Sequence, residues 1–270
     1  MYLQSRGITT ARLDCLVLLE DTLRIPRAKL LAEPETEMKA SQVEQLKKLL
    51  NRRAKHEPLA YIRGRTEFYG RDFKVGPGVL VPRPESETII ELLLRLPELQ
   101  RMPNSDSAKQ RVWKLADVGT GSGALGITAA LELPYCQVEL LDIDKSALDI
   151  AKTNVVLHTS PVLVTLSNLL ESPQQQNDIL LCNLPYVPDD YEINKAAGHE
   201  PAIALFGGKD GLDLYRSFFN QISTITNKPL YILTEALPAS HDDLSILARK
   251  SGYNLEKSQD FVQLFVYKSR

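Results

Sequence analysis

A glycine-rich stretch, DVGTGSGALG at 117–126, joins an apolar run to a segment of helical periodicity. Glycine lets a backbone take positive φ and approach a ligand closely, and the amides that open a helix are free to bind a polar group. The next apolar run ends in Asp142, 21 residues after Gly121, where a carboxylate can accept hydrogen bonds from both hydroxyls of a ribose. This order of elements predicts a nucleoside-binding α/β domain.

The glycine spacing fits two patterns. Gly119, Gly121 and Gly123 match G-x-G-x-G, which is usual for S-adenosylmethionine, whereas Gly121, Gly123 and Gly126 match the dinucleotide pattern G-x-G-x-x-G. The glycines alone therefore leave a methyltransferase and a nicotinamide dehydrogenase open. In either class, the cofactor-binding residues predicted in this turn are Gly119, Thr120, Gly121, Ser122 and Gly123.

Strand and helix patterns alternate from residue 112 onward. Strands are predicted at 112–118, 138–142, 162–166, 178–182 and 230–235, and helices at 124–133, 147–157, 212–226 and 239–250. Residues 253–267 indicate two strands without a helix between them, which must be antiparallel. The predicted fold is α/β: a doubly wound, seven-stranded sheet with an antiparallel C-terminal edge.

The chain before this sheet has a different character. Residues 1–60 predict a small helical domain, with an apolar stripe from Leu13 to Leu23 and a second helix starting at Ser41, where Glu44 completes a capping-box pattern. Residues 61–82 are rich in aromatic and β-branched residues and glycine, which predicts a β-hairpin linker. A helix at 85–96 and a loop at 97–111 open a third segment, 83–270.

Composition excludes several function classes. The chain has 32 basic and 34 acidic residues, so no global positive field draws in nucleic acid. The three cysteines are far apart and form no CxxC pair, which argues against a zinc ribbon or a disulfide framework. His241, Asp242 and Asp243 stand at a predicted helix start, where acids are ordinary, so no metal site is expected. No apolar leader and no run of 18 apolar residues is present, and a cytoplasmic protein is expected.

The predicted strand 178–182 is followed by Asn183-Leu184-Pro185-Tyr186. Ligands of open α/β sheets bind beyond the carboxyl ends of the strands, so this tetrapeptide should lie beside the glycine turn. The Asn183 side-chain oxygen and the Leu184 carbonyl can each accept one proton of a planar NH2 group. Pro185 favours an extended Leu184, and Tyr186 offers a flat face to a substrate. These four residues are the predicted catalytic and substrate-binding motif, and Asn183 is also predicted to contact the cofactor.

Four blocks together resemble the HemK/PrmC family, the protein-(glutamine-N5) methyltransferases that act on peptide-chain release factors. The blocks are DVGTGSGALG at 117–126, NLPY at 183–186, EPLAYIRGRTEF with LVPRPESE within 57–87, and HEPAIALFGGKDGLDLYRSFF at 199–219. The resemblance implies an N-terminal substrate-recognition domain, a hairpin linker and a class I (Rossmann-like) methyltransferase domain. It implies S-adenosylmethionine as donor, S-adenosylhomocysteine as product, and as acceptor the glutamine of the release factor's Gly-Gly-Gln loop, with an effect on translation termination.

The resemblance also implies roles for individual residues. Gly119 to Gly123 would hold the methionine part of the cofactor, Asp142 its ribose, and Asn183 to Tyr186 the glutamine. Leu184 stands where the family usually has proline, which predicts a less rigid Asn183. Asn168 and Leu169 replace the family's Asp–aromatic pair near the adenine, which predicts weaker cofactor binding. The chain begins near what looks like the end of the family's first helix.

Some assignments stay open. Arg83 can contact substrate or simply shape the rim of the site, and His199-Glu200 can support the acceptor loop from behind. An N6-adenine methyltransferase of RNA or DNA remains an alternative, because the same acceptors grip an adenine amino group. A dehydrogenase and a non-catalytic binding module are further alternatives. A basic run on one helix is weak evidence for a nearby nucleic acid; its members are Lys47, Lys48, Arg52, Arg53 and Lys55. A monomer without direct nucleic-acid binding is expected.

Overall fold

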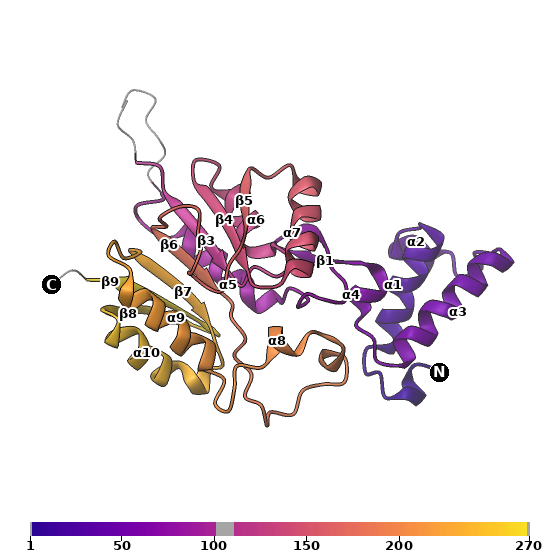
Figure 1. The fold of residues 1–270 in the computed structure, drawn as a ribbon. Coiled ribbons are helices and arrows are strands. Elements are labelled where there is room, and N and C mark those ends of the chain that lie inside the picture. The colour runs from indigo at the N-terminus through magenta and orange to yellow at the C-terminus, as the bar shows by residue number, and fades with distance from the viewer. Residues whose placement is uncertain (1, 101–110, 269–270) are drawn as a thin grey trace.

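The computed structural model describes residues 2–100 and 111–268. Figure 1 shows a group of helices at one end of the molecule and a mixed sheet with its own helices at the other. The first group comprises α1 (Ala11–Leu23), α2 (Arg27–Ala32) and α3 (Ala40–Ala54). The connection runs through α4 (Leu59–Arg63) and a hairpin of β1 (Arg65–Phe68) and β2 (Arg71–Lys74). The hairpin itself is therefore shorter than the segment 61–82.

Helix α1 buries only part of the predicted apolar stripe. Leu13 is half exposed, and the buried positions include Asp14 and Thr22. Asp14 can be buried because Arg53 of α3 donates to its carboxylate across 2.7 Å, and the Thr22 hydroxyl bonds to the Leu18 carbonyl. Val17 and Leu18 of the predicted stripe are buried as expected, whereas Leu13 is not. Paired polar groups share the buried face, and periodicity of apolar residues cannot detect them.

The start of α3 also differs from the prediction. The helix begins at Ala40, so Ser41 lies inside the first turn and does not cap it. The side chain of Gln42 accepts a hydrogen bond from the Lys39 backbone N–H across 2.9 Å. The expected Ser41–Glu44 capping box is therefore wrong. Gln42, three residues after Lys39, provides the hydrogen-bond acceptor for a free backbone N–H at the helix start.

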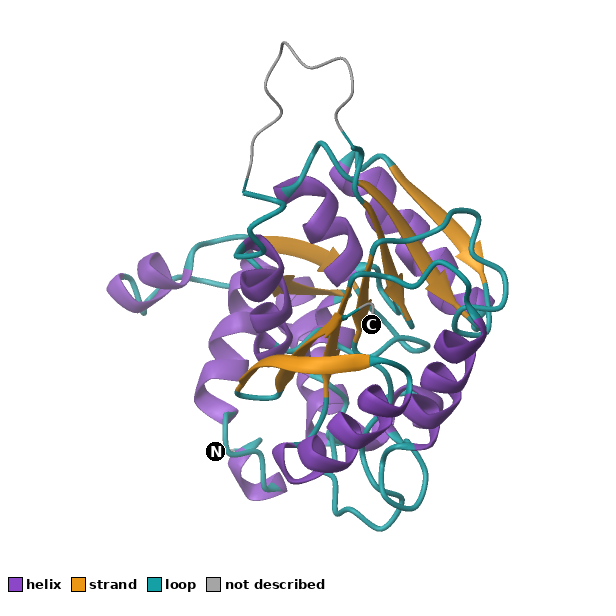
Figure 2. Cartoon of the chain, turned by 90° about the vertical axis from the view of Figure 1, so that its left-hand side faces the viewer, coloured by secondary structure: helices purple, strands orange, loops and turns teal. Residues whose placement is uncertain are grey.

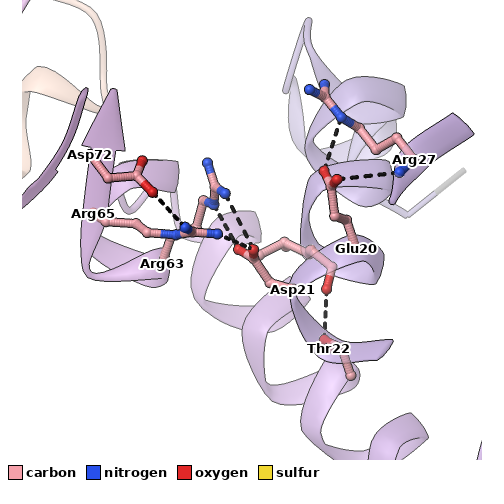
Figure 3. A network of polar contacts seen from close by, with 8 residues as sticks. Glu20, Asp21, Thr22, Arg27, Arg63, Arg65 and Asp72 are labelled. Atoms are coloured by element: carbon pink, nitrogen blue, oxygen red, sulfur yellow. Dashed lines mark hydrogen bonds and ion pairs between the residues drawn. The ribbon is translucent and has the colours of Figure 1, made fainter. Parts of the chain in front are cut away.

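The hairpin joins the two parts of the molecule. Its turn residues Tyr69 and Gly70 both have positive φ, as a two-residue hairpin turn requires, and Phe68 and Phe73 are buried in the core of the sheet domain. On the other side, Asp21 of α1 bonds to Arg63 across 2.6 Å and to Arg65 across 2.9 Å (Figure 3). The helical group is thus attached through ion pairs to a hairpin that packs as part of the sheet domain.

The main sheet has seven strands in the order β5-β4-β3-β6-β7-β9-β8. The pairs among the first five strands are parallel, and β9 is antiparallel to both β7 and β8. The predicted doubly wound sheet with an antiparallel edge is confirmed. The strands are β3 (Lys114–Val118), β4 (Gln137–Asp142), β5 (Val162–Leu166), β6 (Ile179–Cys182), β7 (Tyr231–Glu235), β8 (Tyr253–Gln259) and β9 (Val262–Tyr267).

Helices cover both faces of this sheet (Figure 2). One face packs on α5 (Glu87–Leu94), α6 (Ala124–Glu132) and α7 (Lys145–His158), and the other on α9 (Asp213–Thr224) and α10 (His241–Lys250). The ends of these helices and of β3 to β7 lie within two residues of those predicted. The short α8 (Ala202–Leu205) was not predicted. Most of the predicted loop 97–111 lies outside the described residues.

Among the described residues, no helix combines the length and the apolar character that a membrane crossing requires.

Candidate active site

A cavity of about 190 Å³ opens at the carboxyl ends of β3, β4 and β6. The strand order reverses next to β3, so this is the crevice in which open α/β sheets bind ligands. Most of the predicted site residues come together here. Those lining the cavity are Gly119, Thr120, Gly121, Ser122, Asp142, Asn168, Leu169, Asn183, Leu184 and Pro185. Gly123, Tyr186 and Arg83 lie outside this lining.

The glycine turn needs its glycines for two different reasons. Gly119, Gly121 and Gly123 have φ of +72°, +55° and +83°, a region that other residues enter only with strain. A Cβ on Gly121 would meet nothing within 4 Å, so this backbone faces open space. A Cβ on Gly126 would lie 2.2 Å from a Leu140 methyl group, so Gly126 allows α6 to pack closely on β4. The turn is open toward the cavity and tight toward the sheet.

The Asp117 side chain holds this turn in place through hydrogen bonds. Its Oδ2 accepts hydrogen bonds from the Thr120 hydroxyl across 2.6 Å and from the Gly126 amide across 2.9 Å. The side chain is buried, and burial raises the pKa of Asp117 to about 6. Our sequence prediction did not include Asp117, although the residue opens the glycine block; its position at the end of a buried strand was the available signal.

Asp142 retains capacity for a ligand. Its Oδ2 accepts from the Gly121 amide across 2.8 Å, and its Oδ1 accepts from the Asp144 amide across 2.9 Å. Each carboxylate oxygen can accept a second bond, so two acceptor positions remain. Burial raises the pKa of Asp142, while these backbone bonds act in the opposite direction. Ile143, more than half exposed, adds an apolar surface to the cavity beside this carboxylate and was not predicted.

The third part of the cavity is formed by the turn after β5. The Asn168 amide nitrogen donates to Glu171 Oε1 across 2.8 Å, which directs the amide oxygen of Asn168 elsewhere. Leu169 is buried and holds a φ of 52°. The pair therefore supplies one polar acceptor and one apolar contact.

The acceptor motif follows β6 directly. The Asn183 amide nitrogen donates to the Ser86 hydroxyl across 2.8 Å, which leaves the amide oxygen as the acceptor of this side chain. Leu184 is buried, and one of its methyl groups lies 3.0 Å from where a Gly119 Cβ would stand. The Tyr186 hydroxyl donates to Glu235 Oε1 across 2.9 Å, and burial and this carboxylate both raise the pKa of Tyr186.

A glycine-rich segment after α8 supports the motif. A Cβ on Gly207 would lie 2.4 Å from the Pro185 carbonyl oxygen, and a Cβ on Gly211 would lie 2.2 Å from that of Tyr186. Glycine is therefore required at both positions for the two stretches of backbone to pack together. The segment 207–211 thus fixes the path of the acceptor motif.

Arg83 is held by a buried carboxylate. Glu200 accepts from an Arg83 guanidinium nitrogen across 2.5 Å and from the Val81 amide across 2.8 Å. The side chain of Glu200 is 2% exposed, whereas that of Arg83 is 36% exposed. This ion pair connects the segment before α5 to the loop after β6. Glu200 therefore supports the loop that follows the acceptor motif.

The basic run on α3 is partly neutralised. Arg52 pairs with Glu57, and Arg53 pairs with Asp14. Within the described ranges, no group of three or more histidine, cysteine or acidic side chains is placed to hold a metal ion. The arrangement is that of a nucleoside pocket joined to a site that accepts hydrogen bonds.

Comparison with known proteins assigns both parts of the chain to sequence families. Residues 1–64 match the PrmC N-terminal domain, and residues 99–200 match the methyltransferase small domain. A release factor glutamine methyltransferase of Koribacter versatilis is 36% identical over 82% of this chain and 77% of its own length. One from Coxiella burnetii is 32% identical over 90% of this chain and 85% of its own length. A bifunctional methyltransferase of Rickettsia bellii is 30% identical, and the match spans about half of its length (51%).

Solved structures agree on the fold. The 16S rRNA methyltransferase RsmC of T. Thermophilus, in complex with AdoMet and guanosine, superposes with a TM-score of 0.52 at 16% identity, over 76% of this chain and 50% of its own. The N-terminal domain of human METTL16, in complex with SAH, gives a TM-score of 0.51 at 15% identity, over 73% of this chain and 76% of its own. The identity and coverage of the sequence relatives show that the chain belongs to the family of release factor glutamine methyltransferases.

Proposed function

We propose that the chain transfers a methyl group from S-adenosylmethionine to the side-chain amide nitrogen of the glutamine in the Gly-Gly-Gln loop of peptide-chain release factors. The observation that carries this proposal is the orientation of Asn183. Its amide nitrogen is engaged by Ser86, and its side chain lines the same cavity as the glycine turn. An acceptor for an NH2 group therefore lies beside a nucleoside pocket.

The cavity fits S-adenosylmethionine. Open space beside Gly121, free acceptor positions on Asp142 and the amide oxygen of Asn168 match, in turn, the amino-acid, ribose and adenine parts of that molecule. When bound, the cofactor supplies an electrophilic methyl group on a positively charged sulfur. The residues that would hold it are Gly119 to Ser122, Asp142, Asn168 and Leu169.

The protein's own contribution is to prepare the acceptor nitrogen. An amide nitrogen is a weak nucleophile because its lone pair is delocalised into the carbonyl group. The Asn183 side-chain oxygen and the Leu184 carbonyl can each accept one of its protons, which favours a nitrogen whose lone pair projects out of the amide plane. Holding that lone pair in line with the methyl group lowers the barrier through position and electrostatics. The new bond to the methyl carbon forms as the carbon–sulfur bond breaks. The methylated nitrogen is acidic and releases one proton to water, so no prior deprotonation is required.

Two alternatives are less well supported. A nicotinamide dehydrogenase is expected to have six parallel strands in the order 3-2-1-4-5-6, whereas here an antiparallel strand, β9, lies between β7 and β8. An adenine N6-methyltransferase would use the same two acceptors, but the net charge of −2 and the paired arginines of α3 offer little attraction to RNA. We also propose a cytoplasmic monomer that binds the release factor through its helical N-terminal part and makes no direct contact with nucleic acid.

One competition assay tests this proposal. The protein would be incubated with methyl-labelled S-adenosylmethionine, a release factor and ribosomal RNA in the same tube, and the label in each fraction counted. We expect label on the release factor with wild-type enzyme and a loss of at least about 100-fold with Asn183→Ala. Label on the RNA alone would replace the proposal with adenine methylation, and no label on either would reject it.

A further inference from the structure

Two side chains outside the acceptor motif lie next to the Asn183 side chain. Ser86 comes from the turn that precedes α5, and Glu235 ends β7. Ser86 is 2% exposed and Glu235 is 1% exposed. Neither was predicted as part of the site.

The hydrogens of these groups can be assigned by counting donors and acceptors. A hydroxyl has one proton, and Ser86 already accepts from the Asn183 amide nitrogen, so its own proton must point to another acceptor. Oε1 of Glu235 is taken by the Tyr186 hydroxyl, whereas Oε2 is buried with no hydrogen-bond partner among the described residues. A buried donor and a buried acceptor without partners are both costly.

The same three groups interact electrostatically. Burial raises the pKa of Glu235, while Ser86, Tyr186 and Asn183 each act to lower it. The Ser86 and Asn183 side chains are therefore close enough to stabilise a charge on Glu235. Oε2 of Glu235 is the neighbouring acceptor left without a partner, so the Ser86 proton can turn toward it.

We infer that Glu235 is a positioning residue that acts through Ser86 to hold the Asn183 amide with its oxygen toward the acceptor glutamine. This inference rests on the proposed function, because it assigns a role to Asn183 in that reaction. It adds a residue from β7 and one from the turn before α5 to a site built by β3, β4 and β6.

The physical reason is that the ionised form of Glu235, which Ser86, Tyr186 and Asn183 favour, only accepts hydrogen bonds. The direction of donation is then fixed: the Asn183 amide nitrogen donates to the Ser86 hydroxyl, and the Ser86 hydroxyl donates to Glu235. Oxygen and nitrogen of an asparagine amide are nearly equal in size, so without this direction the side chain could turn over. A turned amide would present its NH2 group to the NH2 group of the substrate, and one of the two acceptors would be lost.

Glu235 also fixes the other end of the acceptor motif. Its Oε1 holds the Tyr186 hydroxyl, and its backbone carbonyl accepts from the buried Tyr215 hydroxyl across 2.6 Å. The Tyr215 hydroxyl also lies 3.0 Å from the carbonyl oxygen of Cys182, the residue before Asn183. One glutamate thus determines both the path of the motif and the direction of its hydrogen bonds.

Glu235→Gln is the test variant, because glutamine keeps the shape but can donate as well as accept. The matched control is Glu139→Gln on β4. Glu139 is also fully buried in the sheet, its Oε1 accepts from the Thr165 hydroxyl, and its Oε2 has no partner among the described residues. It lies outside the cavity. A second pair, Ser86→Ala and Ser86→Thr, removes and then retains the hydroxyl.

The assay measures kcat and KM for the release factor, the cofactor Kd by calorimetry, and the side-chain NH2 signal of Asn183 by NMR. For Glu235→Gln and Ser86→Ala we expect kcat to fall about 100-fold, a shifted Asn183 signal and a cofactor Kd within about twofold of wild type. Ser86→Thr should recover most of the activity, and Glu139→Gln should resemble wild type.

An unchanged kcat in Glu235→Gln would overturn the inference. The inference would also be overturned if the fall in kcat came with weaker cofactor binding and a lower melting temperature. Glu235 would then have a purely structural role. The NMR signal of Asn183 is read without any substrate. If wild-type enzyme fails to methylate the release factor but Glu235→Gln still shifts that signal, the proposed function fails while the orientation of Asn183 by Glu235 stands. If the signal is unmoved, the inference itself fails.

Discussion

Arg83 and Glu200, 117 positions apart in the sequence, form an ion pair of 2.5 Å that joins the segment before α5 to the loop after β6. Ser86 lies three residues after Arg83, so the pair also fixes the turn that carries the partner of Asn183. Glu200 is buried, whereas Arg83 is partly exposed to water. Removing one partner should therefore change the free energy of unfolding by a different amount from removing the other.

We expect Arg83→Met to lower the free energy of unfolding by about 2 kcal/mol, because it leaves the buried Glu200 carboxylate without its charged partner. Glu200→Gln should cost about 1 kcal/mol, since Arg83 can turn toward water and glutamine still accepts from the Val81 amide. Urea denaturation of the two variants measures this. Equal losses, or a larger loss for Glu200→Gln, would show that burial of Glu200 does not control the energetics of the pair.

The two roles of the glycines can be separated by alanine. Gly126→Ala should destabilise the fold by about 2–3 kcal/mol, because its Cβ would overlap a methyl group of Leu140. Gly121→Ala should cost only about 1 kcal/mol for its positive φ, yet it should weaken cofactor binding more than tenfold, because the methyl group enters the cavity. Thermal melting and calorimetry distinguish the two. Normal cofactor affinity in Gly121→Ala would contradict the assignment of the turn to the cofactor.

Asp117 predicts a specific pH dependence of stability. Its pKa in the fold is about 6, above the value of about 3.9 for an unfolded aspartate. The protonated form of Asp117 therefore adds to the free energy of unfolding. This addition is complete below the unfolded pKa of about 3.9 and is lost as the pH rises through 6. The difference in pKa corresponds to about 3 kcal/mol.

Comparison with Asp117→Asn isolates this effect from other titrating groups. Between pH 4 and pH 7, the free energy of unfolding of the wild type should fall by about 2 kcal/mol relative to that of the variant. Both proteins would be unfolded with urea across this range. Parallel pH profiles would mean that the Asp117 carboxylate is not held in its protonated form by burial.

The Asp21 ion pairs test the role of the helical N-terminal part (Figure 3). Asp21→Asn should change stability by no more than about 1 kcal/mol, because these partly exposed pairs are screened by water. We expect a higher KM for the release factor with an unchanged cofactor Kd, as α1 loses its attachment to Arg63 and Arg65. High salt should produce the same change in the wild type. An altered cofactor Kd would contradict this separation of roles.

Much of the fold could be predicted from the sequence because its signals are local. Strand and helix periods, the glycine turn and the acid after the second strand placed Asp142 and Asn183 at one end of a parallel sheet. The two closing strands had no room for a crossover helix, which made their antiparallel pairing predictable.

The remaining features depend on contacts between distant residues. Ser86 and Asn183 are 97 positions apart, and no periodic pattern relates them. The buried face of α1 depends on Arg53, a residue that the sequence presents as part of a charged surface. Glu235 ends an apolar strand, and its burial follows from its neighbours Tyr186 and Tyr215. Such polar groups become informative only once their partners are known.

The most direct test of the account is the position of the methyl group on the release factor. A release factor and its variant with alanine in place of the loop glutamine would each be incubated with the enzyme and S-adenosylmethionine, and the Gly-Gly-Gln peptide sequenced by tandem mass spectrometry. We expect one methyl group on the glutamine side-chain nitrogen, absent from the alanine variant and from reactions with Asn183→Ala enzyme. A methyl group on another residue, or one that persists with Asn183→Ala, would contradict it.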